Sequence, residues 1–81
     1  MVSPWWGVGE YRVGFFSEPG ERDVPHVHIS SGKGAAKFWL EPVRLARNEG
    51  FNEHELSKAR RVVMDNADWL LEEYKAHQRA L

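Results

Sequence analysis

The sequence predicts an α+β fold in which a three- or four-stranded, mostly antiparallel sheet carries one long C-terminal helix on one face. Apolar and polar residues alternate in short stretches between residues 10 and 46, which is the period of a half-buried strand. Turns rich in Gly and Pro separate these stretches. From residue 52 to residue 78, apolar residues recur at the spacing of an amphipathic helix.

Length and composition indicate one globular domain over residues 1–81. The chain is 42% hydrophobic and 28% charged, and its 11 Lys and Arg against 12 Asp and Glu give a net charge of −1. A strongly basic nucleic-acid-binding domain is therefore excluded. Because Cys is absent, disulfides and thiolate metal sites are excluded as well. With no long apolar run and no signal-peptide pattern, we expect a cytoplasmic protein without membrane contact.

The chain begins with residues 1–9, a segment without a clear period, in which we expect Trp5 and Trp6 to cap one end of the core. Alternation then predicts strands, and breaker residues such as the pair Pro19-Gly20 predict the turns between them. Pro42 places the last strand at an edge, because proline lacks the N–H that an inner strand needs. The predicted strands are residues 10–17, 25–31, 35–40 and 43–46.

A helix is predicted from Asn52, because Asn52 and Glu55 have the spacing of a capping box. Phe51 before the cap and Leu56 after it fit a hydrophobic staple. Apolar residues then continue at a seven-residue spacing, which favours one continuous helix to residue 78. The alternative is a break near Asn66, since asparagine is a poor helix former and a good cap.

The predicted strands sort their side chains between two faces, because successive residues of a strand point to opposite sides. We expect the helix to cover an apolar face made of Val13, Phe15, Val27, Ile29, Ala36, Phe38, Leu40, Val43 and Leu45. The other face would be uncovered and would carry Arg12, Phe16, His26, His28, Lys37, Trp39 and Arg44.

The uncovered face combines imidazoles, cations and large aromatic rings. Histidine can exchange a proton near neutral pH, which makes His26 and His28 the candidate catalytic residues. Cations complement phosphate, and aromatic rings can stack on bases. The candidate binding residues are therefore Arg12, Phe16, Lys37, Trp39 and Arg44.

Other interpretations of these residues stay open. His26 and His28 form a His-X-His pair that could hold zinc or copper if Glu10, Glu21, Asp23 or His54 supplied a third ligand. Both histidines could instead hydrogen-bond the turn at residues 18–23. Trp39 and Phe16 could be covered by the N-terminal tryptophans. We expect no resident metal and no cofactor.

The run PHVHISSGKGAAKFWLEPVRLARNEGF, followed by NEHELSKARRVV, resembles a small bacterial family called domain of unknown function 4160. Its members share a P-H-x-H strand, a strand of the type A-K-F-W-L and a C-terminal helical segment. The resemblance runs from about Phe15 to Tyr74, and Val24 replaces a proline that the family often has. It implies a small partner protein encoded by a neighbouring gene, in an arrangement similar to toxin–antitoxin pairs.

Three functions fit these observations. The first is a non-catalytic module that docks an acidic partner protein or a ligand on the uncovered face. The second is a toxin-like domain that binds or cleaves RNA, with His26 or His28 as general acid or base and Arg12, Lys37 or Arg44 stabilising the phosphate. The third is a metal site at His26 and His28.

Overall fold

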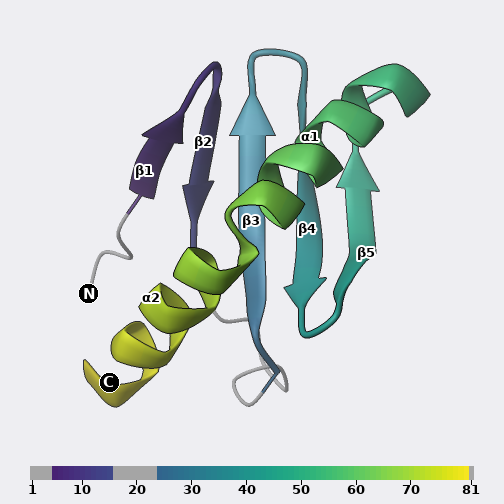
Figure 1. The fold of residues 1–81 in the computed structure, drawn as a ribbon. Helices are drawn as coiled ribbons and strands as arrows, with labels where there is room; N and C mark the ends of the chain where they lie inside the picture. Colours follow the sequence, from purple (N-terminus) through teal and green to yellow (C-terminus); the bar gives the residue numbers. More distant parts are fainter. Residues whose placement is uncertain (1–4, 16–23, 81) are drawn as a thin grey trace.

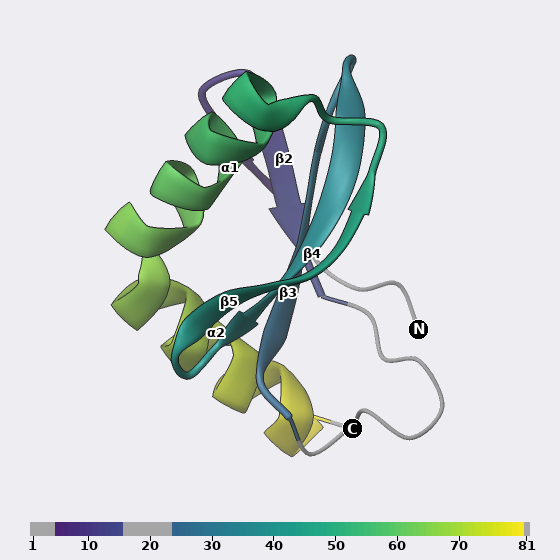
Figure 2. The ribbon, with the colours of Figure 1, turned by 90° about the vertical axis from the view of Figure 1, so that its right-hand side faces the viewer.

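The computed structural model describes residues 5–15 and 24–80, with the side chains of residues 5–15 and 24–77. Figure 1 shows a five-stranded antiparallel sheet crossed by two helices, with the strands in the order β1-β2-β3-β4-β5. Figure 2 shows both helices on the same face of this sheet. The elements are β1 (Trp5–Val8), β2 (Tyr11–Gly14), β3 (His26–Ser31), β4 (Gly34–Leu40), β5 (Val43–Glu49), α1 (Glu53–Asp65) and α2 (Ala67–Ala80).

The α+β class is confirmed, but the predicted number of strands is wrong. The additional strand is β1, which pairs antiparallel with β2 from Trp5 opposite Gly14 to Val8 opposite Tyr11. Gly9 turns the chain between them with a φ of 61°, a conformation that glycine adopts without steric cost. The WWGV sequence of β1 has no apolar–polar alternation, so the periodicity that revealed the other strands was missing here.

The two N-terminal tryptophans lie on opposite faces of the sheet, because they are consecutive residues of a strand. The ring of Trp6 packs edge-on against Phe15, with 5.6 Å between centroids, and against Trp69 of α2, with 5.2 Å between centroids. Trp6 therefore joins the core, as expected. Trp5 belongs to the face without helices and remains 39% exposed.

The prediction of one continuous helix is wrong, and the break falls at Asn66. Its side-chain amide donates to the carbonyl oxygen of Val62 at 2.8 Å, which satisfies one of the free carbonyls at the end of α1. Its own carbonyl accepts from the backbone N–H of Leu70 at 2.8 Å and so starts α2. Val63 of α1 and Leu70 of α2 are seven residues apart and are both buried, so the apolar spacing continues across the break.

The predicted start of the helix is confirmed at Asn52. The side chain of Asn52 accepts from the backbone N–H of Glu55 at 2.8 Å, and the Glu55 carboxylate accepts from the backbone N–H of Asn52 at 2.9 Å. These two bonds form a complete capping box. Phe51 is buried beside this cap and Leu56 is half-buried against the core.

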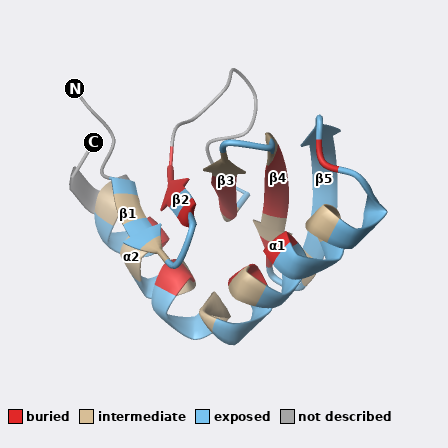
Figure 3. Cartoon of the chain, turned by 90° about the horizontal axis from the view of Figure 1, so that it is seen from above, coloured by how far each residue is buried: buried red, intermediate tan, exposed pale blue. Residues whose placement is uncertain are grey.

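The core lies between the helices and one face of the sheet (Figure 3). Seven of the nine apolar residues expected there are buried, and the two exceptions lie on β5. Val43 is half-buried and packs against the core, whereas Leu45 is 37% exposed, so the predicted burial is only partial for Val43 and wrong for Leu45. The reason is that β5 is an edge strand, as the position of Pro42 predicted, and has a neighbour on one side only.

Among the residues that the structure describes, no helix is long and apolar enough to cross a membrane.

Candidate functional site

The face of the sheet opposite the helices is called here the helix-free face. Strand pairing aligns its side chains in three rows that run across the strands. One row is Trp5, Gly14, His28, Lys37 and Arg47; the second is Arg12, Ser30, Ala35 and Glu49; the third is His26, Trp39 and Arg44. Residues of all five strands, from Trp5 of β1 to Glu49 of β5, therefore contribute to one surface.

The predicted alternation along β3 is confirmed. Val27 and Ile29 are fully buried and belong to the core, whereas His26 and His28 belong to the helix-free face. The expectation that this face is uncovered is wrong at its centre: His26 is 0% exposed, Lys37 is 2% exposed and His28 is 8% exposed. His28 and Lys37 stand in a row that continues on both sides, so they lose solvent contact even without a covering helix. His26 has no partner on β2, and its ring packs instead against Tyr74 of α2, with 5.5 Å between centroids.

Several aromatic groups surround His26. Its ring centroid lies 5.5 Å from that of Tyr74, 6.3 Å from that of Trp39 and 5.6 Å from that of His28. Its Nδ1 lies 2.8 Å from the carbonyl oxygen of Val24. Because a carbonyl oxygen can only accept, Nδ1 carries the proton, and in the neutral ring Nε2 is then the acceptor. This bond goes to Val24, which follows the turn at residues 18–23; that turn lies outside the described residues, so the expected bonds to it stay a prediction.

Each tryptophan of the helix-free face lies close to a cation. The ammonium nitrogen of Lys37 lies 4.8 Å from the centre of the Trp39 ring. The guanidinium carbon of Arg12 lies 5.6 Å from the centre of the Trp5 ring. Both distances are within the range of cation–π attraction. These contacts restrict the long cationic side chains to the surface of the sheet.

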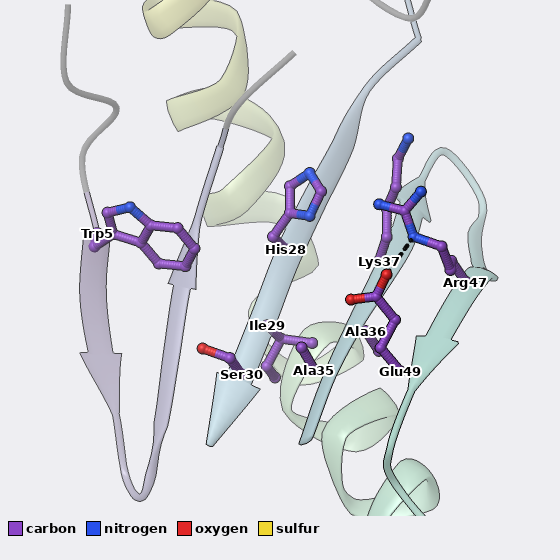
Figure 4. Close-up of a pocket in the computed structure, with 9 residues that line it drawn as sticks. All are labelled: Trp5, His28, Ile29, Ser30, Ala35, Ala36, Lys37, Arg47 and Glu49. Carbon is purple, nitrogen blue, oxygen red and sulfur yellow. Dashed lines mark ion pairs between the residues drawn. The ribbon is translucent and has the colours of Figure 1, made fainter. Parts of the chain in front are cut away.

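Two hollows open on the helix-free face. The first has a volume of about 120 Å³, and Figure 4 shows Trp5 on one side of it and the Arg47–Glu49 ion pair on the other. That ion pair joins Nε of Arg47 to Oε1 of Glu49 at 3.2 Å. The second hollow has a volume of about 230 Å³ and is lined by Val24, Trp39, Glu41, Pro42 and Arg44.

The helix-free face brings together six of the seven predicted site residues. Phe16 lies outside the described residues. Strand pairing places the others in the three rows, with the imidazoles and Lys37 at the centre and the arginines toward the rim. The six are Arg12, His26, His28, Lys37, Trp39 and Arg44.

Sequence reasoning missed Trp5 because it missed β1, and it missed Arg47 because of a bulge. Lys37 pairs with Arg47 while its neighbour Phe38 pairs with Leu45, so Ala46 has no partner residue on β4. The extra residue reverses the alternation beyond it. Without the bulge, strict period two along β5 would put Arg47 on the opposite face from Arg44. No local signal in the sequence marks this irregularity.

A third metal ligand does not accompany His26 and His28 within the described part of the chain. There, no group of three or more His, Asp or Glu side chains is arranged to hold a metal ion. Of the candidate third ligands, Glu21 and Asp23 lie outside the described residues. Two imidazoles alone are fewer ligands than a zinc site has.

Comparison with known proteins gives one match. The family model described as a domain of unknown function, DUF4160, matches residues 11–75. No curated protein and no solved structure matches the chain significantly. The matched range contains β2 to β5, α1 and most of α2, whereas β1 and Trp5 precede it.

Proposed function

The chain belongs to the DUF4160 family, and we propose that it is a small non-catalytic binding module that docks an acidic partner protein on its helix-free face. The charge of this face carries the proposal. Within the five described strands it holds three exposed cations, Arg12, Arg44 and Arg47, and the buried Lys37, against one carboxylate, Glu49. The whole chain has a net charge of −1, so the positive charge is local. A local patch of this kind attracts and orients a partner of opposite charge.

The arrangement of the face also suits binding. The rows stand on a hydrogen-bonded sheet, and the stacking of Arg12 on the Trp5 ring restricts its motion before a partner arrives. Ordering a long side chain on binding costs roughly 0.5–1.5 kcal/mol, so restriction beforehand lowers that cost. Arginine and tryptophan are also the residue types that most often dominate interface energies.

Burial of the histidines is the reason for placing catalysis second. A general acid or base must come within about 2.6–3.2 Å of the proton that it transfers. The side chain of His26 is fully buried, and its Nδ1 is engaged with Val24. Binding through the exposed arginines requires no such access.

The proposal is tested with the small protein that a neighbouring gene encodes, since the family resemblance points to it as partner. Light scattering and calorimetry would measure complex formation by wild type and by the double variant Arg44→Glu, Arg47→Glu. We expect a complex at micromolar concentration, weakened tenfold or more in this variant and weakened further by salt. The matched control is Arg60→Glu, Arg61→Glu, which makes the same charge change on α1. Absence of a complex, or equal loss in both variants, would contradict the proposal.

RNA cleavage remains the second candidate, favoured by one row of the helix-free face. His28 stands beside Lys37, and Lys37 beside Arg47, so a proton-transfer group adjoins two cations that could stabilise a phosphate. Expression should then arrest growth, and His28→Ala or His26→Ala should relieve the arrest. A wild-type chain that is harmless on expression would reject this function.

A metal site at His26 and His28 is the third candidate. Its test is the metal content of protein purified without a polyhistidine tag. Bound zinc or copper near one equivalent would support it, and a content near zero would dispose of it.

A further inference from the structure

The side of α1 that faces away from the sheet carries the most exposed large apolar side chain among the described residues. Met64 is 59% exposed, whereas the other exposed side chains of this kind are 37–44% exposed. Figure 3 shows exposed residues along this outer side of α1. Methionine is flexible and polarisable, and it occurs often at binding surfaces. Met64 therefore marks the outer side of α1 as a candidate contact surface.

A hollow of about 240 Å³ lies directly beside Met64. It is lined by Ser57, Arg60, Arg61, Met64 and Asp65. The first four have the spacing i, i+3, i+4 and i+7, and residues three or four apart are neighbours on a helix surface. In coiled coils, four neighbouring residues of one helix form the hole that receives a side chain of the facing helix. The hollow has room for such a side chain, since an apolar cavity of about 150 Å³ holds benzene.

The same surface carries charges of both signs. Arg61 and Asp65 both line the hollow and are both exposed. Within the described part of the chain, no ion pair joins either of them to another residue. A pair between Arg61 and Asp65 of one chain would be weak, because a base followed by an acid is the less favourable order on a helix. Both charges are therefore available to a second molecule.

We infer that the outer side of α1 binds a second copy of the chain, with the two α1 helices antiparallel and Met64 of each copy in the hollow of the other. A two-fold axis keeps the same side of each antiparallel helix together. Since Asp65 follows Met64 and lies on the same side as Arg61, the carboxylate of Asp65 meets the guanidinium of Arg61 on the second copy. Each contact occurs twice, as in every dimer with this symmetry.

Self-complementarity is the reason for choosing a second copy rather than another protein. The projecting side chain, the hollow, the cation and the carboxylate all belong to residues 57–65, so two copies satisfy each other completely. The contact is small, and small interfaces are typical of weak complexes. We therefore expect a dimer that dissociates on dilution.

This surface is separate from the helix-free face. Both helices lie on one side of the sheet (Figure 2), so a copy bound to α1 leaves the other side open. The inference goes beyond the proposed function and does not depend on it.

Sedimentation equilibrium measures the mass of the chain as a function of its concentration. Wild type should pass from monomer toward dimer as the concentration is raised to about 1 mM. Met64→Ala removes the side chain that fills the hollow, and it should weaken the association about tenfold or more. The matched control is Val24→Ala, which shortens another exposed apolar side chain away from α1 and should leave the association unchanged.

Reversal of one charge at a time tests the antiparallel arrangement. In Arg61→Glu alone or Asp65→Lys alone, like charges would meet at both ends of the contact, so each variant should associate about tenfold or more weakly than wild type. An equal mixture of the two variants places opposite charges at both ends, and the association should return to near the wild-type value. Both positions are exposed, and thermal unfolding would verify that each variant is folded.

Three results would overturn the inference. The first is a wild-type chain that stays monomeric at about 1 mM. The second is a mixture of the charge variants that associates no better than either variant alone. The third is a dimer that persists in Met64→Ala and in both charge variants, which would place the contact elsewhere, such as at the exposed edge of β5. The proposed function is decided separately, because monomeric α1 variants keep the helix-free face and should still bind the acidic partner.

Discussion

Gly34 stands where β4 leaves the turn after β3, and its replacement by alanine should destabilise the protein. A Cβ at this position would lie 2.8 Å from the backbone nitrogen of Phe51, 2.9 Å from the backbone carbon of Gly50 and 3.0 Å from the backbone oxygen of Glu49. All three are backbone atoms, so no side chain can rotate away. The end of β5 and the segment before α1 would have to move.

The magnitude follows from this crowding. Overpacking in a well-packed region costs about 1–3 kcal/mol, and each kcal/mol lowers Tm by about 4–8 °C in a domain of this size. Gly34→Ala should therefore lower Tm by about 4–24 °C.

Gly32 provides the matched control. It lies two residues earlier in the same turn, and a Cβ there would meet nothing within 4 Å. Because Gly32→Ala also reduces the freedom of the unfolded chain, it should leave stability unchanged or raise it by up to about 1 kcal/mol. Thermal and urea unfolding of both variants would be compared. Equal stability of Gly34→Ala and Gly32→Ala would refute the close approach of β4 to the start of α1.

Two further predictions concern single groups. Asn52→Ala removes the side-chain acceptor of the capping box and should lower the free energy of unfolding in urea by about 1 kcal/mol. Asn52→Asp keeps an acceptor and should lower it much less. Equal losses in the two variants would contradict the role of Asn52 as a cap. Burial, assisted by the nearby carboxylates of Glu10 and Glu55 and opposed by Lys33, raises the pKa of Tyr11 above its ordinary value of 10.0. The folded protein thus holds this proton more tightly than the unfolded chain, so the stabilisation is fully present below pH 10.0 and is lost as pH rises through the raised pKa. The free energy of unfolding of wild type and of Tyr11→Phe would be measured at alkaline pH. Wild type should lose stability relative to Tyr11→Phe as the pH rises above 10.0, and parallel profiles of the two proteins would contradict the prediction.

Local sequence was sufficient to predict those features that depend on one short-range pattern. The alternation of His26, Val27, His28 and Ile29 placed the imidazoles and the core on opposite faces of β3, and the capping box placed the start of α1 at Asn52. These features depend on residues within a few positions of each other, so a single sequence contains them.

The rest depended on contacts between distant segments. β1 becomes a strand by pairing with β2, the bulge at Ala46 arises between β4 and β5, and the burial of His26 comes from Trp39 and Tyr74. The break at Asn66 was hidden for another reason. Apolar spacing continues across it, so periodicity favoured one helix although Asn66 had the chemistry of a cap.

The central claim is that acidic partners bind to the helix-free face rather than to the helices. Its most direct test is a spectrum of the arginine Nε–H groups during titration with a short acidic peptide, Glu-Asp-Tyr-Glu-Asp, capped at both ends. We expect the signals of Arg12, Arg44 and Arg47 to move and those of Arg60 and Arg61 on α1 to stay in place. Movement of the α1 signals alone, or equal movement of all five, would contradict the claim.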